Sequence, residues 1–489
     1  MTLTKSTAVT TIRRQWVGLG ILCLATLLVS LDLFVMLLAV PAVTEALGAT
    51  GSQQLWILDV YGFMVAGLMI TMGNLGDRLG RRRLLLIAAA VFGAASIVAA
   101  YSTSPGMLIG ARAVLGIAGA AIAPCTLSLI STMFPDARRR TTALGVWAGC
   151  FTIGAVVGPI AGGVLLNHFW WGSAFLIGVP AMAILLAVGP FLLPEYRDET
   201  AGRIDVPSVA LSLAAILPAI YGLKQLASHG VSQVAVATLV VGVVLGWLFV
   251  RRQRRLAEPL VDVRLFAQRA FSVTLGSMLS YSMLSGGVMV FVAQYFQLVQ
   301  GMTPLRAGIA LVPGMITSTV AFQVTPRLAR RVRPGVLIPG GLAFTVAGMV
   351  VMTQATSTPA LVIAFALAGV GAAPLVTLGT NLVIGSVPPE KAGAAGALTQ
   401  TGNEFGYALG IAVLGSVVTA IYSNQMNGQG GSSLGEAVST NVPPAVLEAA
   451  RDAFTSGLHL AAGITAVVLT VVSILLARTH RALPALGDD

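Results

Sequence analysis

Four ionisable side chains stand inside long apolar runs of the sequence: Asp32, Asp59, Arg112 and Glu404. A charged side chain within a membrane-spanning helix costs roughly 3 kcal/mol or more, so it faces a cavity or a partner. Burial favours the protonated form of a carboxyl group, whereas a nearby cation favours the ionised form. These residues therefore predict a site where protons and cations compete for carboxylates. A purely structural role for each residue is the alternative.

Asp32 and Arg112 are placed to meet. If their apolar runs both span a membrane, the two residues lie roughly 12 Å and 9 Å from the same face, at about 1.5 Å per residue. The matching depths predict an ion pair between the two helices. This pair either switches during a functional cycle or is a permanent structural salt bridge.

The other two acids have different surroundings. Glu404 stands near the middle of its run, and the small residues Gly402 and Gly406 beside it indicate a helix that borders an open cavity. Asp59 stands near the outer end of its run, close to Tyr61. The structural alternatives are a carboxyl satisfied by neighbouring helices for Glu404 and an interfacial capping acid for Asp59.

Aromatic residues near the acids indicate what kind of molecule would bind. A lipophilic cation is held by apolar and aromatic walls together with a nearby acid. The predicted substrate-binding set comprises Asp32, Asp59, Tyr61, Tyr295, Glu404 and Tyr407. Ordinary packing within a helix bundle is the alternative for the tyrosines.

The composition restricts the elements that can position these residues. The 489-residue chain has a mean hydropathy of +0.88, and only 10% of its residues are charged. A soluble domain carries roughly 25% charged residues, so a soluble enzyme, a nucleic-acid binder and a disordered chain are all excluded. The chain is predicted to be an all-α polytopic membrane protein. Apolar runs long enough to span a bilayer cover residues 16–40, 54–75, 83–101, 106–132, 141–166, 172–193, 206–223, 234–250, 271–298, 307–326, 335–354, 359–386, 392–422 and 456–477.

The basic residues test this count of fourteen spans. With the N-terminus in the cytoplasm, only Lys224, Arg306 and Arg451 of the 29 basic residues fall in outer segments, and Arg112 lies within a span. Basic residues collect in cytoplasmic loops, so both termini are predicted to be cytoplasmic. The net charge of +11 is then a consequence of topology and not of nucleic-acid binding.

A weak internal repeat predicts the domain organisation. Residues 73–83 and 326–331 are basic segments at equivalent span ends, as in transporters that are built from repeated halves. The predicted domains are an N-terminal six-helix bundle (1–200), an inserted helix pair (201–255) and a C-terminal six-helix bundle (256–489). The hydrophilic residues 423–455 form an extracellular loop, which is either a lid or a tolerated surface insertion.

Two glycine-rich motifs predict moving parts. The loop after the second span contains Gly73, Gly76, Asp77, Arg78, Gly80 and Arg81. It indicates either a conformational switch, in which the aspartate and an arginine lock helices together, or a simple basic anchor. The fifth span contains Gly154, Gly158, Pro159, Gly162 and Gly163. Close helix packing and a proline kink at these positions favour a hinge, and ordinary small-residue packing is the alternative.

Together these segments resemble the major facilitator superfamily. Residues 73–83, 108–120 and 154–163 are similar to its signatures in the loop after span 2, in span 4 and in the fifth span of antiporters. Residues 31–41 and 54–61 resemble the fourteen-span drug:proton antiporters of the QacA/SmvA/LfrA type, but Phe34 and Leu37 stand where that family often has Thr and Asn.

The resemblance implies two six-helix bundles with two inserted helices, in the cytoplasmic membrane of a bacterium. It implies a transporter and not an enzyme, acting as a monomer and driven by the proton-motive force without a cofactor or a metal. Its partners would be drugs, protons and membrane lipids. Asp32, Arg112 and Glu404 would couple proton entry to the export of lipophilic cations such as quaternary ammonium compounds and ethidium. A dedicated exporter of one antibiotic, fatty acid or other anionic metabolite is the alternative.

Overall fold

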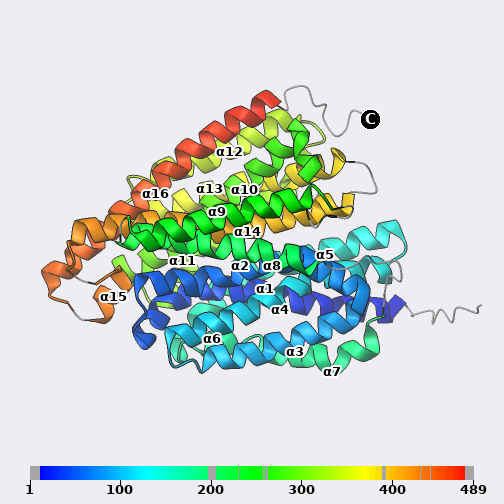
Figure 1. Ribbon diagram of the computed structural model, residues 1–489, viewed down its shortest axis with the longest axis horizontal. Coiled ribbons are helices and arrows are strands. Elements are labelled where there is room, and N and C mark those ends of the chain that lie inside the picture. Colours follow the sequence, from blue (N-terminus) through cyan, green and yellow to red (C-terminus); the bar gives the residue numbers. More distant parts are fainter. Residues whose placement is uncertain are drawn as a thin grey trace, which may run out of the picture.

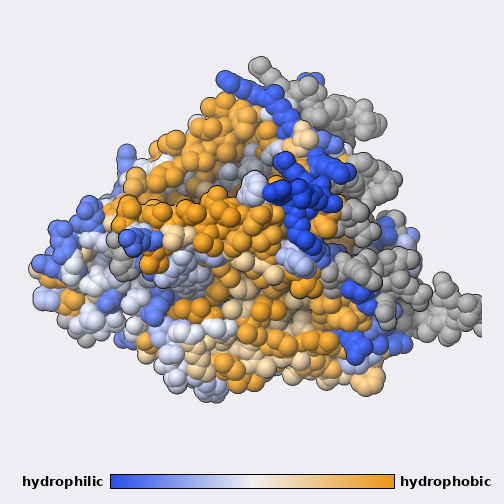
Figure 2. All heavy atoms as spheres, in the orientation of Figure 1, coloured by the Kyte–Doolittle hydropathy of each residue, from blue (hydrophilic) through white to orange (hydrophobic). Residues whose placement is uncertain are grey.

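A computed structural model describes residues 12–195, 205–229, 231–256, 259, 261, 263–387, 392–429, 431–440 and 442–479. In this part of the chain, fourteen helices are long and apolar enough to cross a membrane. This number confirms the fourteen spans predicted from the apolar runs. On the face shown in Figure 2, apolar side chains cover the middle of the molecule and hydrophilic side chains gather toward its two ends.

The first six spans pack together as the N-terminal group. In this group α1 contacts α5, α4 contacts both α2 and α3, and α3 contacts α7. The short α6 and α7 together make the sixth span. The helices are α1 (Ile12–Leu47), α2 (Gly51–Leu79), α3 (Arg81–Ala100), α4 (Pro105–Met133), α5 (Ala137–His168), α6 (Ser173–Leu176) and α7 (Val179–Leu192).

The last six spans pack together as the C-terminal group. Here α13 contacts α11 and α12, α14 contacts α10, and α16 contacts α12 and α14. The ninth span includes a π-helical segment, η2, at the end of α10. The elements are η1 (Val263–Ala267), α10 (Arg269–Gln294), η2 (Tyr295–Val299), α11 (Pro304–Leu328), α12 (Pro334–Met352), α13 (Thr358–Gly385), α14 (Ala392–Met426), α15 (Leu434–Ser439) and α16 (Pro444–Thr479).

The first and last spans are longer than predicted. The first apolar run was placed at residues 16–40, but α1 extends from Ile12 to Leu47. The last was placed at residues 456–477, but α16 is one continuous helix from Pro444 to Thr479. Residues 444–455, which were predicted to belong to the extracellular loop, are therefore the first part of this helix. Proline is favoured at a first helical position, where its missing N–H is not needed.

Glycine contacts join the two groups. A Cβ atom on Gly62 of α2 would lie 2.8 Å from that of Ala408, at the middle of α14. A Cβ atom on Gly163, near the end of α5, would lie 2.5 Å from the Cα atom of Leu305 at the start of α11. The end of the molecule where α1 stops and α15 is found is called the α15 end (Figure 1). The opposite end, where α1 begins, is called the basic end.

The segment between α14 and α16 crosses between the groups at the α15 end. The backbone N–H of Gly51, the first residue of α2, donates to Oγ of Ser432 over 2.9 Å. The carboxylate of Glu436 accepts 2.7 Å hydrogen bonds from both the backbone and the hydroxyl of Ser432. Leu434 and Ala437 of α15 are buried. This segment of the C-terminal group therefore packs on helices of the N-terminal group.

The inserted pair, α8 (Val206–His229) and α9 (Gln233–Gln253), is a helical hairpin that lies on the seam between the groups. Its first helix contacts α2 and α14. Ile220 of α8 forms a small apolar cluster with Phe63 of α2 and with Ala408 and Ala412 of α14. The second helix packs against α8. The hairpin thus covers the place where α2 and α14 meet.

Candidate functional site

The N-terminal group holds a buried ion pair between α1 and α4. Nη1 of Arg112 donates to Oδ2 of Asp32 over 2.8 Å, and the two residues are only 1% and 7% exposed. Nε of Arg112 donates to the carbonyl oxygen of Ile57 on α2 at 3.1 Å. The guanidinium carbon lies 4.7 Å from the centre of the Tyr61 ring. The pair expected from matching depths is formed, and it joins α1, α2 and α4.

Glycines on α4 allow Tyr61 to approach this pair. Arg112, Gly116 and Gly119 are separated by four and three residues, so they share one helix face. A Cβ atom at Gly116 would lie 2.6 Å from the Tyr61 carbonyl oxygen, and one at Gly119 would lie 2.8 Å from the Tyr61 hydroxyl oxygen. Gly119 was not among the residues predicted from the sequence. The helical spacing between Gly119 and Arg112 is the signal that could have identified this glycine.

Asp59 is buried inside α2, with 1% of its surface exposed. An acid that caps a helix at the membrane surface would be exposed to water, so its burial argues against an interfacial capping role. Asp59 and Tyr61 are two residues apart, and residues at that spacing face different sides of a helix. Because Tyr61 faces the ion pair, Asp59 does not belong to the same face of α2.

Glu404 lies within α14 in a more open environment. The residue is half-buried, and its Oε1 accepts a 3.2 Å hydrogen bond from Nε2 of Gln400, an exposed side chain one turn nearer the basic end. The neighbouring Asn403 accepts a 3.2 Å hydrogen bond from Ser282 of α10. A Cβ atom at Gly406 would lie 2.8 Å from a carbonyl oxygen of α10, so the two helices are in close contact here. The carboxyl group of Glu404 is therefore held in place and is half-buried, and the Gly406 side of α14 packs on α10 instead of bordering the open cavity that was predicted.

The contact between α2 and α14 brings Glu404 toward the buried pair. Tyr61 of α2 packs against Arg112, and its neighbour Gly62 faces Ala408, which lies one turn after Glu404 on α14. Tyr407, also on α14, packs its ring over Gly286 of α10. Phe405, next to Glu404, meets Phe63 of α2 edge to face, with ring centres 6.3 Å apart. The structure therefore gathers both carboxylates, one arginine and several aromatic rings where α2 and α14 approach each other.

Tyr295 lies outside this group. It begins the π-helical segment η2, and its hydroxyl donates to the carbonyl oxygen of Thr356 over 3.2 Å. The ring packs edge to face with Phe296. The sequence analysis grouped Tyr295 with the substrate-binding residues by residue type alone. The structure instead uses its hydroxyl group to hold the connection between α12 and α13.

The glycine-rich motif after α2 forms a compact turn at the basic end. Asp77 pairs with Arg81 one turn later, and a Cβ atom at Gly76 would lie 2.9 Å from the Arg81 side chain. Gly80 has a φ of +102°, a conformation that L side chains rarely adopt, so this position requires glycine. A Cβ atom at Gly73 would be in ordinary contact, 3.8 Å from Pro124 of α4. Of the predicted switch residues, Arg78 is exposed.

Glu195, which was not predicted from the sequence, follows α7 and contacts this turn at the same end of the molecule. One carboxylate oxygen accepts the backbone N–H of Arg82 at 3.2 Å, and the other lies 3.3 Å from the Arg82 Nε. Arg82 also donates to the carbonyl oxygens of Pro190 and Leu193. The sequence signal for this contact was an acidic residue directly after a span, on the same side of the membrane as the basic loop after α2. These contacts tie the α2–α3 turn to the end of α7.

The glycine motif of α5 provides two close contact faces. Toward α1, a Cβ atom at Gly154 would lie 2.8 Å from the Leu27 carbonyl oxygen, one at Gly158 would lie 2.7 Å from the Phe34 Cβ, and one at Gly162 would lie 3.0 Å from the Val35 side chain. Toward α11, Gly163 meets Leu305, and the carbonyl oxygen of Pro159 would lie 2.4 Å from a Cβ at Gly308. The motif thus packs α5 within its own group and also against the other group.

Within the residues that the structure describes, no three His, Cys, Asp or Glu side chains are grouped so that they could hold a metal ion. The chemistry of the site therefore has to be considered in terms of carboxylates, one arginine, tyrosines and small residues.

Comparison with known proteins places this arrangement in a family. The family model described as Major Facilitator Superfamily matches residues 22–411. The chain is 41% identical to the multidrug efflux pump LfrA of Mycolicibacterium smegmatis, covering 93% of this chain and 94% of LfrA. It is 35% identical to the methyl viologen resistance protein SmvA of Salmonella typhimurium, covering 90% and 93%. It is 30% identical to the puromycin resistance protein pur8 of Streptomyces alboniger, covering 94% and 90%.

Solved structures agree on the fold. A bacterial homologue of the human lysosomal transporter Spinster, in an inward-facing and unoccupied conformation, superposes with a TM-score of 0.68. The superposition covers 96% of this chain and 98% of that one at 16% sequence identity. The family match, the relatives and the fourteen membrane-spanning helices all agree. The chain belongs to the major facilitator superfamily and is a multi-pass membrane transporter, not an enzyme.

Proposed function

We propose that this transporter exports lipophilic cationic drugs in exchange for protons, by alternating access of one central site to the two sides of the membrane. The observation that carries this proposal is the position of Glu404, a half-buried carboxyl group on the part of α14 that packs against α2 next to the Tyr61 ring and its partner Arg112. The similarity to a multidrug efflux pump and to two resistance proteins supports drug export.

Competition for a carboxylate couples the two fluxes. A protonated carboxyl has no charge to attract a cation, whereas an ionised one favours a cation beside it. A proton entering from the acidic side therefore releases the drug, and a drug arriving from the other side displaces the proton. Glu404 and Asp32 are the two acids of the group that can serve in this exchange, and Arg112 modulates Asp32. The driving force is the proton gradient, with no cofactor.

The charges of the site favour cations over anions. Arg112 is the basic residue of the group, and its charge is already compensated by Asp32 at 2.8 Å. In the described part of the chain, Glu404 forms no ion pair, so its negative charge is the one available to a ligand. An aromatic cation would find this charge and the half-buried ring of Tyr407, whereas the Tyr61 ring is already covered by Arg112. The alternative of a dedicated anion exporter would need an uncompensated arginine.

The test is gradient-driven transport of ethidium by purified protein in proteoliposomes. An imposed pH gradient is expected to drive ethidium uphill, and collapse of the gradient with a protonophore is expected to stop it. Absence of ethidium flux from folded, correctly inserted protein would contradict the proposal. Movement of an anionic or lipid substrate under the same gradient would then support the dedicated exporter.

Replacing Gly163 by leucine is expected to slow transport about tenfold. The added side chain would collide with the backbone of α11, because a Cβ atom alone would lie 2.5 Å from Leu305. Overpacking of this kind costs about 1–3 kcal/mol, and 1.4 kcal/mol is a factor of ten in an equilibrium. The state that is closed at the α15 end would therefore become scarce. The initial rate of ethidium transport measures the effect.

Gly149 offers a matched control on the same helix. A Cβ atom there would have no neighbour within 4 Å, so Gly149→Leu is expected to leave the rate within about twofold of the wild type. Equal loss in both variants would show that the effect comes from α5 itself and not from its contact with α11.

A further inference from the structure

The second helix of the inserted pair is exposed along most of its length. Of its residues only Ala235, Gly242 and Gln253 are buried, and the first two of these face α8. Its exposed apolar side chains are Val234, Val236, Val240, Val241, Val243, Val244, Trp247, Leu248 and Val250. In a membrane transporter this face of α9 is covered by lipid acyl chains.

At the basic end, α9 finishes in four arginines within five residues: Arg251, Arg252, Arg254 and Arg255. Figure 2 shows a hydrophilic patch there, directly beside the apolar surface of the helix. The backbone N–H of Arg255 donates to the carbonyl oxygen of Arg252 at 2.9 Å, so the helical turn continues past Gln253. Trp247 and Arg251 are four residues apart in α9 and share one face, and Arg255 follows in the turn directly after the helix. The Arg251 guanidinium lies over the Trp247 ring, 5.2 Å from its centre.

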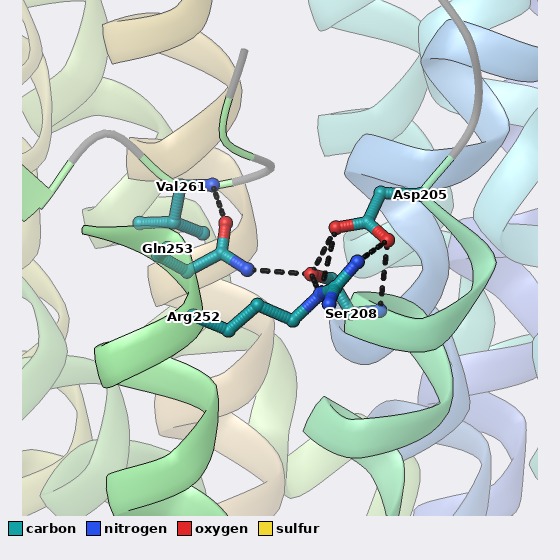
Figure 3. A network of polar contacts seen from close by, with 5 residues as sticks. All are labelled: Asp205, Ser208, Arg252, Gln253 and Val261. Carbon is teal, nitrogen blue, oxygen red and sulfur yellow. Dashed lines mark hydrogen bonds and ion pairs between the residues drawn. The ribbon is translucent and has the colours of Figure 1, made fainter. Parts of the chain in front are cut away.

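One arginine of the four is already used within the protein. Arg252 donates to the two carboxylate oxygens of Asp205 at 2.7 and 3.2 Å and to the Ser208 hydroxyl at 3.1 Å (Figure 3). These bonds hold the pKa of Asp205 below its usual range, so at neutral pH the acid is ionised and compensates Arg252. Gln253 donates to Ser208 at 2.7 Å and accepts the backbone N–H of Val261 at 3.1 Å. This network clips the adjoining ends of α8 and α9 together.

The charges of Arg251 and Arg255 are not compensated in this way. Both side chains are exposed or partly exposed at the tip of the helix, and neither has a carboxylate partner among the residues that the structure describes. They lie at the boundary between an apolar, lipid-facing stripe and water. Arginine side chains bind phosphate groups well, and basic residues next to a membrane-spanning helix attract anionic lipid.

We propose that Trp247, Arg251 and Arg255 form a binding site for an anionic phospholipid, with the phosphate of phosphatidylglycerol on the two arginines and an acyl chain along Trp247, Val244 and Val240. The proposal rests on the membrane location of the chain and not on the identity of the exported drug. The bound lipid holds the tip of α9 at the headgroup level. Because the Asp205–Arg252 clip joins α9 to α8, the lipid also keeps α8 against the seam between α2 and α14.

Quenching of Trp247 fluorescence tests this site. The protein is placed in vesicles of phosphatidylcholine that contain a small fraction of brominated phosphatidylglycerol or, in a parallel series, brominated phosphatidylcholine. The part of the signal that belongs to Trp247 is obtained by subtracting the same series for Trp247→Phe. We expect brominated phosphatidylglycerol to quench Trp247 at an about thirtyfold lower mole fraction, since two basic side chains contribute.

Two variants decide between a defined site and general attraction by positive charge. Arg251→Gln/Arg255→Gln is expected to abolish the preference for phosphatidylglycerol at Trp247. Arg330→Gln/Arg331→Gln removes the same charge from an exposed pair beyond α11 and is expected to leave it unchanged. Equal quenching by both lipids in the wild type, or equal loss in both variants, would overturn the proposal. Size-exclusion profiles confirm that each variant is folded.

Discussion

Replacing Asp32 by asparagine is expected to destabilise the protein by about 3–5 kcal/mol and to reduce cation transport to background. The substitution keeps the shape of the side chain but removes the negative charge that lies 2.8 Å from Arg112. Arg112 is 1% exposed, and its remaining partners would be the Ile57 carbonyl, the Tyr61 ring and the amide oxygen of the new asparagine, none of which carries a negative charge. A buried charge without compensation is the costly product of breaking such a pair. Thermal unfolding in detergent measures the loss.

A double variant separates the structural role of the pair from its role in transport. Asp32→Asn/Arg112→Gln removes both charges, so most of the lost stability is expected to return. Transport is expected to stay at background, because the acid that exchanges protons is still missing. A single Asp32→Asn variant as stable as the wild type would show that the pair contributes little to the fold. Proton-driven transport by the double variant would remove Asp32 from the coupling path.

The sequence predicted the membrane spans because each depends on the length of one apolar run, which is a local property. It also predicted the Asp32–Arg112 pair, since two opposite charges at similar depth have few other ways to be compensated. The orientation of a side chain around a helix is a different matter. It depends on which helices are neighbours, so the surroundings of Tyr295 and Asp59 could not be derived from position along the chain.

Contacts between distant segments were the hardest to predict. Glu195 follows the sixth span, yet it completes the turn after the second, because α7 ends beside that turn. The inserted hairpin was identified by counting spans, but its position on the α2–α14 seam arises from apolar packing of Ile220 with Phe63 and Ala408. Neither contact has a sequence spacing that would reveal it, whereas Gly119 lies at a helical spacing from Arg112.

Replacing Glu404 by glutamine is expected to abolish proton-driven transport of cations while the protein stays folded. Glu404 is half-buried, and its recorded hydrogen bond is accepted from Gln400, a bond that the carbonyl oxygen of a glutamine can also accept. The change in stability should therefore stay within about 1 kcal/mol. The charge that attracts a cation and the group that exchanges a proton are both lost. Ethidium flux under a pH gradient is the measurement.

Two controls make this result specific to the site. Glu448→Gln is the same chemical change on an exposed acid of α16, and Gln400→Ala removes the partner of Glu404 but keeps its charge. Both are expected to transport ethidium at a rate similar to the wild type. Undiminished cation efflux by Glu404→Gln would contradict the assignment and leave Asp32 as the acid in exchange.

Asp32 and Glu404 differ in how easily a cation can reach their charges. Asp32 is held by Arg112 in a buried pair, so a cation can reach its charge only if that pair opens. Glu404 is half-buried and, in the described part of the chain, has no basic partner. A drug is therefore expected to meet Glu404 first, and equilibrium binding of ethidium without a gradient should weaken more in Glu404→Gln than in the double variant Asp32→Asn/Arg112→Gln. The reverse order would mean that the buried pair opens before the drug binds, and that Asp32 is the primary cation site.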